Sequence, residues 1–204
     1  MLAIWGRTNS VNVQKVLWCC EEIGLEYQRI DAGGPFGIVD TPEYRRRNPN
    51  GLVPTIDDDG FVLWESNAIV RYLAAKHSSP LWPEDPRRRA DADQWMDWSH
   101  TFWGALRTAF LGLIRTPSEQ RNEAAIAESL RKTEELLQLV DDHLRSRHYL
   151  AGDEFTVGDI PLGSGIWRWM AMPIERRARP NVARWFERLS ERPVYRKIVM
   201  SPLT

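Results

Sequence analysis

Cysteine, long apolar runs and an excess of charge of either sign are all scarce in this 204-residue sequence. Its two cysteines, Cys19 and Cys20, are too few for a disulfide framework, which favours a reducing compartment. No run approaches the ~20 apolar residues of a membrane span, and the first residues lack the apolar stretch of a signal peptide. The formal net charge of -1 gives no electrostatic reason to expect nucleic acid or an anionic membrane as a partner. We therefore expect a cytoplasmic protein that binds neither.

Metal-binding patterns are also lacking. The four histidines are scattered, without the HxH or HExxH spacing that places two ligands on one face of an element. Two adjacent cysteines on a helix cannot reach ordinary disulfide geometry without distortion. We therefore expect no metal, core packing for Cys20 and no reactivity for Cys19.

What is present begins with an alternation of short β-favouring runs and helical patterns over residues 1–77. The turn Asp57–Gly60 joins two of the strands as a hairpin, and Ser66 stands where it would cap the helix that follows. The order β-α-β-α-β-β-α predicts a small α/β domain with a mixed sheet. Strands are predicted over 2–5, 27–30, 54–56 and 61–64, and helices over 11–23 and 42–46 and from 66 onward.

The rest of the chain is predicted to be helical. Residues 78–86, with three prolines and two serines, are expected to form a linker to an all-helical domain over 87–204. Helices are predicted over 90–114, 118–145 and 181–190. Thr156 and Asp159, three residues apart before another apolar helix, form a capping-box pattern in which Asp replaces the usual Glu or Gln. The predicted fold class is thus α/β followed by an all-α bundle.

Four segments together resemble the glutathione S-transferases. They are NPNGLVP (48–54), WESNAIVRYLA (64–74), YLAGDEFTVGDI (149–160) and RPNVARWFERLSERP (179–193). They keep their order over essentially the whole chain, and the sequence is most similar to serine-type, theta- or phi-like members from bacteria and plants. The resemblance implies a thioredoxin-like glutathione-binding domain, then a helical substrate and dimerisation domain, in a homodimeric detoxifying transferase with glutathione as cosubstrate.

The resemblance also implies how glutathione is held. The Val53–Pro54 bond is expected to be cis, leaving the N–H and C=O of Val53 to pair with the cysteinyl backbone like a short added strand. Ser66 is expected to bind the γ-glutamyl carboxylate at a helix N-terminus, and Glu65 the ligand's ammonium group. The alternatives are that Pro54 sits in a plain edge turn, that Ser66 is only an N-cap and that Glu65 is only a favourable first-turn charge.

The thiol-activating group is expected at the start of the first helix, in GRTNSVNVQKV (6–16). Ser10 stands six residues before Val16, which matches the serine of the plant-type pattern. A hydroxyl at a helix N-terminus can donate to a thiolate, aided by the helix dipole. Asn12 is the second candidate and Asn9 another nearby amide. The alternative is that Ser10 and Asn9 only cap the helix.

One departure concerns the glycine carboxylate of glutathione. Leu52 stands where similar proteins often carry Lys or Gln, and the loop 33–44 contains neither Lys nor His. Leu52 therefore leaves this carboxylate without its usual cation. The arginines of the run 45–47 are possible substitutes, although three charges on a short helix more often form a solvated face.

The electrophile is expected to bind between the domains, against the helix from residue 90. Trp103, Arg107 and Phe110 are its predicted pocket, with Trp98 and Phe102 nearby. The alternatives are core packing for the aromatics and an ordinary ion pair for Arg107. A cation there would favour a substrate that carries or develops negative charge.

The predicted function is thiolate attack on a small hydrophobic electrophile, halogenated or unsaturated. Two other functions are weighed against it. One is a non-catalytic binding module of the same fold. The other is a glutathione-dependent isomerase, although the SSCS-like start of the maleylacetoacetate isomerases is absent.

Overall fold

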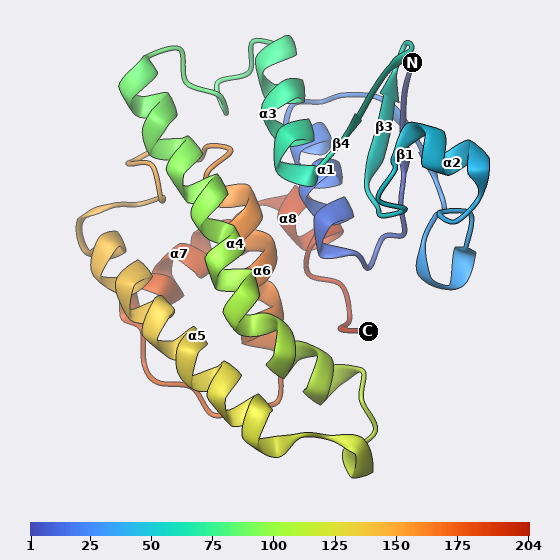
Figure 1. Cartoon of the computed structure of the whole chain (residues 1–204). Helices are drawn as coiled ribbons and strands as arrows, with labels where there is room; N and C mark the ends of the chain where they lie inside the picture. The colour runs from blue at the N-terminus through green and yellow to red at the C-terminus, as the bar shows by residue number, and fades with distance from the viewer. The chain divides into compact units, whose positions relative to one another are not determined.

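The computed structural model describes all 204 residues, which form two compact units, Met1–Trp82 and Pro83–Thr204. The first unit has the expected thioredoxin-like order, and the second is helical, so the predicted fold class is confirmed (Figure 1). The elements of the first unit are β1 (Leu2–Trp5), α1 (Val11–Glu22), β2 (Tyr27–Ile30), the 3-10 turn η1 (Gly34–Phe36), α2 (Pro42–Arg47), β3 (Thr55–Asp58), β4 (Phe61–Trp64) and α3 (Ser66–Lys76).

The sheet of this unit has the strand order β2-β1-β3-β4. β1 pairs with β2 in parallel, whereas the β1–β3 and β3–β4 pairs are antiparallel. Trp5, Thr55 and Trp64 lie on one rung of the sheet. The chain therefore leaves β1, enters β3 and leaves β4 at the same end of the sheet.

Helices α1 and α3 pack side by side in this unit (Figure 1). Each buries the apolar stripe that its spacing predicts, because residues three and four apart share one helix face. The fully buried side chains of these two helices include Val13, Val16, Cys20, Ile69, Val70, Leu73 and Ala74. The packing brings the N-terminal turns of two helices that are far apart in sequence into one region.

Two boundaries in this unit differ from the prediction. β3 begins at Thr55 rather than at Pro54, since a proline has no N–H to donate to the ladder. Ser66 is the first residue of α3, and the cap position belongs to Glu65, so the prediction of Ser66 as N-cap was wrong. The reason is that the backbone of Glu65 is left-handed, with φ of 73°, and the helix begins only after it.

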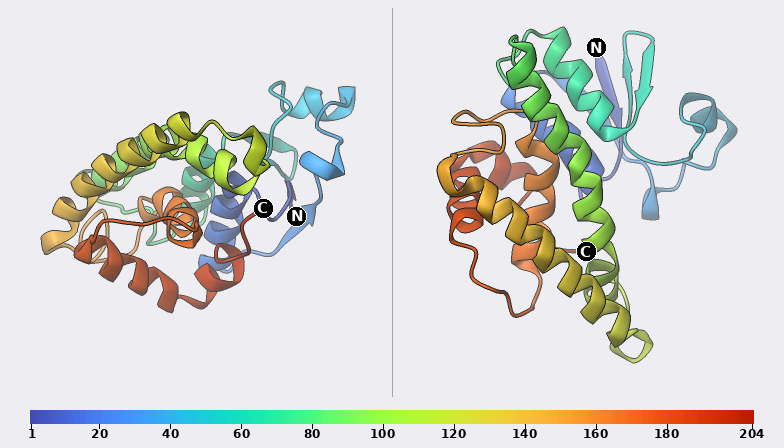
Figure 2. Two further views of the ribbon diagram at one scale, coloured as in Figure 1. Left: turned by 90° about the horizontal axis from the view of Figure 1, so that it is seen from below. Right: turned by 60° about the vertical axis from the view of Figure 1, so that its left-hand side comes forward.

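The second unit consists of helices, and the long helix α4 packs against both α5 and α6 (Figure 2). None of the helices in the structure is both long and apolar enough to span a membrane. The elements are α4 (Pro86–Ile114), the 3-10 turn η2 (Ser118–Gln120), α5 (Glu123–His143), the 3-10 turn η3 (Leu144–Ser146), α6 (Asp159–Ala171), α7 (Pro180–Glu191) and α8 (Pro193–Ile198).

Prolines begin helices here where the prediction had them in a linker or after a helix. The carboxylate of Asp85 accepts hydrogen bonds from the N–H groups of Arg87 (3.0 Å) and Arg88 (2.9 Å), so α4 begins at Pro86, four residues earlier than predicted. Pro193 was predicted to end the last helix, yet it opens α8. A proline fits the first turn of a helix, because the N–H that it lacks has no intrahelical partner there.

The predicted capping box forms in part: Asp159 reaches back to Thr156, but α6 begins at Asp159 with Gly158 at the cap position. The carboxylate of Asp159 accepts from the N–H of Thr156 at 3.0 Å, and the Thr156 hydroxyl accepts from the N–H of Gly158 at 3.2 Å. Asp159 also accepts from the Leu150 N–H and from Trp185 Nε1, both at 2.9 Å. This carboxyl is fully buried, and desolvation raises its pKa to about 6. It ties the start of α6 to α7 and to the segment before α6.

Candidate active site

The predicted site residues of the first unit gather at one end of its sheet. Ser10 follows β1, Val53 precedes β3 and Ser66 follows β4, all at the end marked by the Trp5–Thr55 pair. The pairing of the first two strands also continues past β1, since the N–H of Gly6 donates to the carbonyl of Ile30 at 2.9 Å. Strand pairing therefore assembles a site from three segments that lie apart in the sequence.

Ser10 occupies the N-cap position of α1. Its backbone is extended, with φ of -81° and ψ of 123°, and its carbonyl accepts from the N–H of Gln14 at 2.9 Å. The side chain, however, makes no capping hydrogen bond. The hydroxyl is half-buried at the positive end of the helix dipole. It is therefore free of the capping role that was its alternative, and it can donate to an external anion.

Ser66 lies in a polar cluster at the start of α3. It is buried, and its hydroxyl donates to Oδ1 of Asn12 at 3.3 Å. The ammonium group of Lys15, only 1% exposed, lies 3.5 Å from Ser66 Oγ and 3.4 Å from Asn67 Oδ1. An ammonium group can only donate, so it leaves the Ser66 hydroxyl proton directed elsewhere. Asn12 thus lies at the α3 end of the site.

Lys15 was not among the predicted residues. It stands within the quoted start of the first helix, but its neighbours Val13, Val16 and Leu17 form the apolar stripe. The spacing carries no sign that a lysine between them is buried, since a long side chain at such a position more often reaches water. Only the packing of α1 against α3 places its ammonium group beside Ser66.

Glu65 joins β4 to α3 through a strained backbone. Its φ of 73° is rarely adopted by a residue with a side chain and costs on the order of 1–3 kcal/mol. Contacts on both sides of Glu65 hold this conformation. Before it, Trp64 pairs with Thr55 in the sheet. After it, the N–H of Ile69 donates to the Glu65 carbonyl at 2.9 Å. The result is an exposed carboxylate directly before the N-terminus of α3.

The corner before β3 has the expected backbone. The Val53–Pro54 peptide bond is cis, as predicted. Pro54 is buried and Val53 half-buried. Leu52, beside them, leaves 64% of its surface exposed, so an uncharged side chain faces solvent where similar proteins often carry Lys or Gln.

Two buried side chains hold this corner. The hydroxyl of Tyr44 donates to the carbonyl of Leu52 at 2.7 Å, and Nδ2 of Asn48 donates to the same oxygen at 2.9 Å. Both also contact the hydroxyl of Thr55, at 2.8 and 3.1 Å. The residues on either side of Val53–Pro54 are therefore fixed to α2 and its C-cap. The prediction missed both residues, although Asn48 is the first letter of the NPNGLVP segment.

Two of the three arginines of α2 pair with carboxylates. Arg45 forms an ion pair with Asp40 at 2.8 Å and donates to the carbonyl of Pro49 at 3.1 Å, and Arg46 forms an ion pair with Glu43 at 3.2 Å. Arg47 lies 3.5 Å from the carbonyl of Glu43, and its guanidinium lies over the ring of Trp5, 5.2 Å from the ring centre. The paired side chains are mostly exposed, which fits a solvated face.

The predicted electrophile residues lie on α4 in the second unit. Trp103 and Phe110 both lie beside Arg168, whose guanidinium is 5.8 and 5.9 Å from their ring centres. Arg168, which the prediction missed, is buried, and desolvation lowers its pKa to about 10. Arg107 is exposed and Phe102 is fully buried. Phe102 is thus a core residue, whereas Trp103 and Phe110 pack around a buried cation.

The cysteines take no part in this arrangement. Both are fully shielded from solvent, and the Cys19 thiol lies 3.9 Å from the carbonyl of Val70. Burial raises the pKa of both thiols, to about 12 for Cys20. Because the thiolate is the reactive form, these are packing residues, as predicted.

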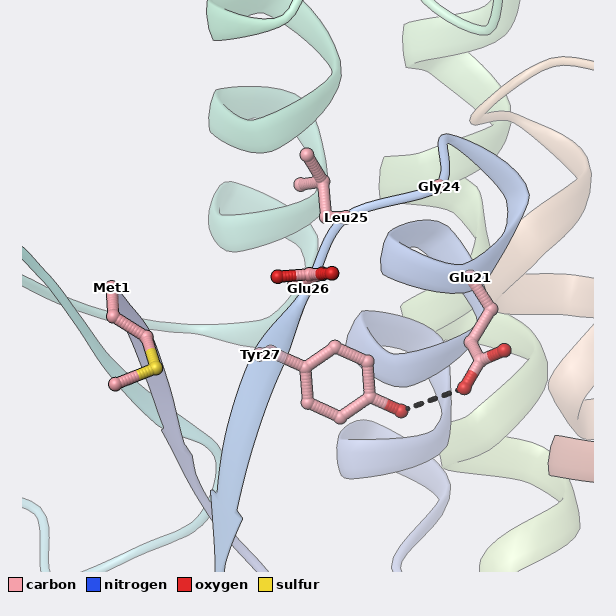
Figure 3. Close-up of a pocket in the computed structure, with 6 residues that line it drawn as sticks. All are labelled: Met1, Glu21, Gly24, Leu25, Glu26 and Tyr27. Carbon is pink, nitrogen blue, oxygen red and sulfur yellow. Dashed lines mark hydrogen bonds between the residues drawn. The ribbon is translucent and has the colours of Figure 1, made fainter.

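A surface hollow of about 590 Å³ lies at the other end of α1 (Figure 3). Figure 3 shows Tyr27 extending from β2 toward the end of this helix, where its hydroxyl donates to Glu21 at 3.0 Å. Burial and this hydrogen bond raise the pKa of Tyr27. Ser10 is at the opposite end of α1, so the hollow is separate from the site. Its lining residues are Met1, Glu21, Gly24, Leu25, Glu26 and Tyr27.

Comparison with known families gives two matches that together cover most of the chain. Residues 9–76 match the model of the glutathione S-transferase N-terminal domain. Residues 101–193 match the model of the glutathione S-transferase C-terminal domain. The order of the two matches is that of the two compact units.

Individual proteins show the same similarity. The chain is 46% identical to the glutathione S-transferase GstB of Escherichia coli strain K12, over the full length of both. It is 52% identical to a theta class glutathione S-transferase from Xanthomonas axonopodis pv. citri, solved with glutathione bound, with a TM-score of 0.97 over 100% of this chain and 99% of that one. Glutathione transferase F7 from Populus trichocarpa has a TM-score of 0.88 at 25% identity, over 99% of this chain and 100% of that one.

Proposed function

Because the chain belongs to the glutathione S-transferase family, we propose that the sheet end carrying Ser10, Val53 and Ser66 is its glutathione site, and that Ser10 activates the thiol. The observation that carries the proposal is the Ser10 hydroxyl, which stands at the N-terminus of α1 without capping it. The activity itself follows from the family: the protein is a glutathione S-transferase.

Glutathione is bound along three segments in this proposal. The N–H and C=O of Val53 pair with the cysteinyl backbone, as in β-augmentation. The γ-glutamyl carboxylate takes the place of Asn12 Oδ1 as the acceptor of the Ser66 hydroxyl, at a helix N-terminus that favours an anion. The exposed carboxylate of Glu65 pairs with the ligand's ammonium group. The bacterial theta class relative at 52% identity was solved with glutathione bound, which supports a glutathione site in this chain.

Ser10 then acts on the sulfur. A thiol with a pKa near 8.5 is mostly protonated at neutral pH, and a hydrogen bond donated to the thiolate lowers that pKa. The thiolate attacks an electrophilic carbon. In a substitution, the carbon–halogen bond breaks and the halide leaves with its electron pair. In a conjugate addition, the electron pair moves into the unsaturated system, which is then protonated.

The electrophile is held in part by Trp103, Arg107 and Phe110 of α4. Half-buried Trp103 supplies apolar area and the exposed guanidinium of Arg107 supplies a cation, whereas Phe110, only 6% exposed, contributes mainly by packing against Arg168. This combination fits a small, largely apolar electrophile, halogenated or unsaturated, that develops negative charge as it reacts.

We also propose a cytoplasmic homodimer, in which each thioredoxin-like unit docks on the helical half of its partner. The edge strand β4 supports this proposal, because it leaves Phe61 49% and Trp64 36% exposed. Exposed aromatic side chains on an edge strand are a surface that association covers.

Two assays test the function. The protein should be retained on immobilised glutathione and eluted by free glutathione. It should also conjugate glutathione to members of a panel of aryl halides, haloacids and unsaturated carbonyl compounds. Retention without turnover of any member would favour the binding module instead. Release of an isomerised substrate without net consumption of glutathione would favour the isomerase.

A further inference from the structure

The side chain of Arg7 lies against the backbone of Gly33 and Gly34, and Gly33 is also close to Val53. A Cβ atom placed on Gly33 would come within 3.2 Å of Arg7 Nη1 and within 3.4 Å of both Val53 methyl groups. A Cβ atom on Gly34 would come within 3.3 to 3.5 Å of Arg7 Cδ, Nε and Cζ. Both glycines have positive φ, of 75° and 57°, a region that residues with side chains rarely adopt. The guanidinium of Arg7 and the side chain of Val53 therefore both lie close to Gly33.

The backbone of Arg7 is fixed at this place. Its N–H donates to the carbonyl of Ala32 at 3.1 Å, and its carbonyl accepts from the N–H of Ser10 at 3.2 Å. The side chain is half-buried and forms no ion pair. Among the other guanidinium groups near this end of the sheet, Arg29 pairs with Asp31, Arg45 and Arg46 pair as described above, and Arg47 lies over the ring of Trp5. Arg7 is thus a positioned cation whose donors are open to a ligand.

The order of the strands places Arg7 on a particular side of Val53. Across the sheet end run Ser66 after β4, Val53 before β3, Arg7 after β1 and Gly33 after β2. Val53 therefore lies between Ser66 and Arg7. A tripeptide with its first carboxylate at Ser66 and its central residue at Val53 carries its last residue away from Ser66, toward Arg7.

We propose that Arg7 binds the glycine carboxylate of glutathione. The inference rests on the proposed function, because it assumes that Ser66 binds the γ-glutamyl carboxylate and that Val53 pairs with the cysteinyl backbone. A guanidinium offers two parallel N–H donors that match a carboxylate, which gives strength and fixes orientation. The uncharged, exposed side chain of Leu52 leaves this task to another residue. Arg7 makes the site specific for a ligand with a free carboxylate at its third residue.

The test compares three ligands by calorimetric titration: glutathione, its glycine ethyl ester and γ-glutamylcysteine. Arg7→Ala should weaken binding of glutathione about ten- to 150-fold, the loss expected for a hydrogen bond to a charged group. It should change binding of the ester and of γ-glutamylcysteine by less than about twofold, since both lack the glycine carboxylate. Arg7→Lys should recover part of the loss, because it keeps the charge without the paired donors. Arg46→Ala, the matched control, should bind all three ligands like the wild type, because that exposed guanidinium pairs only with Glu43.

Several outcomes would overturn the proposal. Equal weakening of all three ligands would show that Arg7 supports the loop, and no weakening of any would show that it does not bind. Should Arg7→Ala fail to fold, Arg7→Gln replaces it, and wild-type protein that does not prefer glutathione to the ester also refutes the proposal. Ser66→Ala separates this from the proposed function, because it should weaken all three ligands alike. If it weakens none, the γ-glutamyl assignment is wrong whatever Arg7 does.

Discussion

Oδ1 of Asn12 lies 3.3 Å from Oγ of Ser66, so the first turn of α1 and the first turn of α3 are joined by a hydrogen bond. Lys15 approaches the same hydroxyl from the protein interior, at 3.5 Å, and can only donate. The hydroxyl proton is therefore directed to Asn12 when no ligand is present, and a bound carboxylate can replace the amide as its acceptor. This geometry places Asn12 beside Ser66, the residue proposed to bind the γ-glutamyl carboxylate, and Ser10 remains the residue proposed to act on the thiol.

Ser66→Ala should raise the Michaelis constant for glutathione about tenfold or more, because a hydrogen bond to a charged acceptor is lost. Turnover at saturating glutathione should fall much less, since the interaction lies away from the sulfur. Steady-state kinetics with varied glutathione give both constants. Ser118→Ala is the control, because that exposed hydroxyl contacts only its neighbour Glu119. An unchanged glutathione dependence in Ser66→Ala would refute the role.

Ser10→Ala should lower the rate of the chemical step about ten- to 150-fold at neutral pH, through loss of a bond to the thiolate. The deficit should shrink as the pH rises and bound glutathione ionises without help. Affinity for glutathione should change little. The measurements are turnover and thiolate absorbance from about pH 6 to about pH 9.5, on either side of the ordinary thiol pKa.

Asn12→Ala is the companion variant in that titration. Its turnover should stay within about twofold of the wild type, because its amide belongs to the Ser66 end of the site. A loss of less than about threefold in Ser10→Ala at every pH, with a larger loss in Asn12→Ala, would exchange the two roles.

Tyr44→Phe should lower the free energy of unfolding by about 1–3 kcal/mol and raise the Michaelis constant for glutathione. It deletes the hydroxyl that holds the Leu52 carbonyl beside the Val53 corner. Tyr72→Phe is a matched control, since its hydroxyl donates to Asp58 at the opposite end of β3. Denaturant unfolding and kinetics should show a stability loss in both variants but a kinetic loss only in the first. A similar Michaelis constant in the wild type, Tyr44→Phe and Tyr72→Phe would show that the Tyr44 hydroxyl does not support glutathione binding at Val53.

Asp159 should make stability depend on pH in an unusual direction. Burial raises its pKa from 3.8 to about 6. As the pH falls, the folded protein therefore binds a proton at this carboxyl near pH 6, whereas the unfolded chain binds it only near pH 3.8. Its contribution to stability is therefore largest below the unfolded pKa and is lost as the pH rises through the folded pKa, by about 3 kcal/mol in total. Asp159→Asn cannot titrate. The difference in unfolding free energy between wild type and variant should shift in favour of the variant as the pH rises from about 4 to about 7. A constant difference would contradict the assignment.

Light scattering at micromolar concentration should give the mass of a dimer of the 23.7 kDa chain. Phe61→Glu should shift the protein toward the monomer, because a charge on the exposed edge strand opposes burial of that surface. A wild-type monomer at that concentration would refute the dimer. A Phe61→Glu dimer as stable as the wild type would instead remove β4 from the interface.

The sequence by itself determined the order of the elements, because this depends on local patterns, and it named Ser10, Val53 and Ser66, which the structure brings to one end of the sheet. Apolar spacing predicted α1 and α3, the Asp57–Gly60 turn predicted the hairpin, and Thr156 with Asp159 predicted the capping box. The prediction was wrong at Pro86 and Pro193, which begin α4 and α8. A proline fits the first turn of a helix as well as it fits a linker or the residue after a helix. Local propensity does not distinguish these positions.

Only the tertiary structure decided which other polar side chains lie beside the proposed site. Lys15 is buried because α1 packs on α3, Tyr44 because α2 folds over the corner before β3, and Arg7 lies beside Val53 because β1 runs between β2 and β3. Each of these contacts joins residues that strand pairing or helix packing brings together from distant positions. A hydrogen bond or an ion pair needs its partner within a few ångström, and sequence spacing sets that distance only within one helix turn or one hairpin.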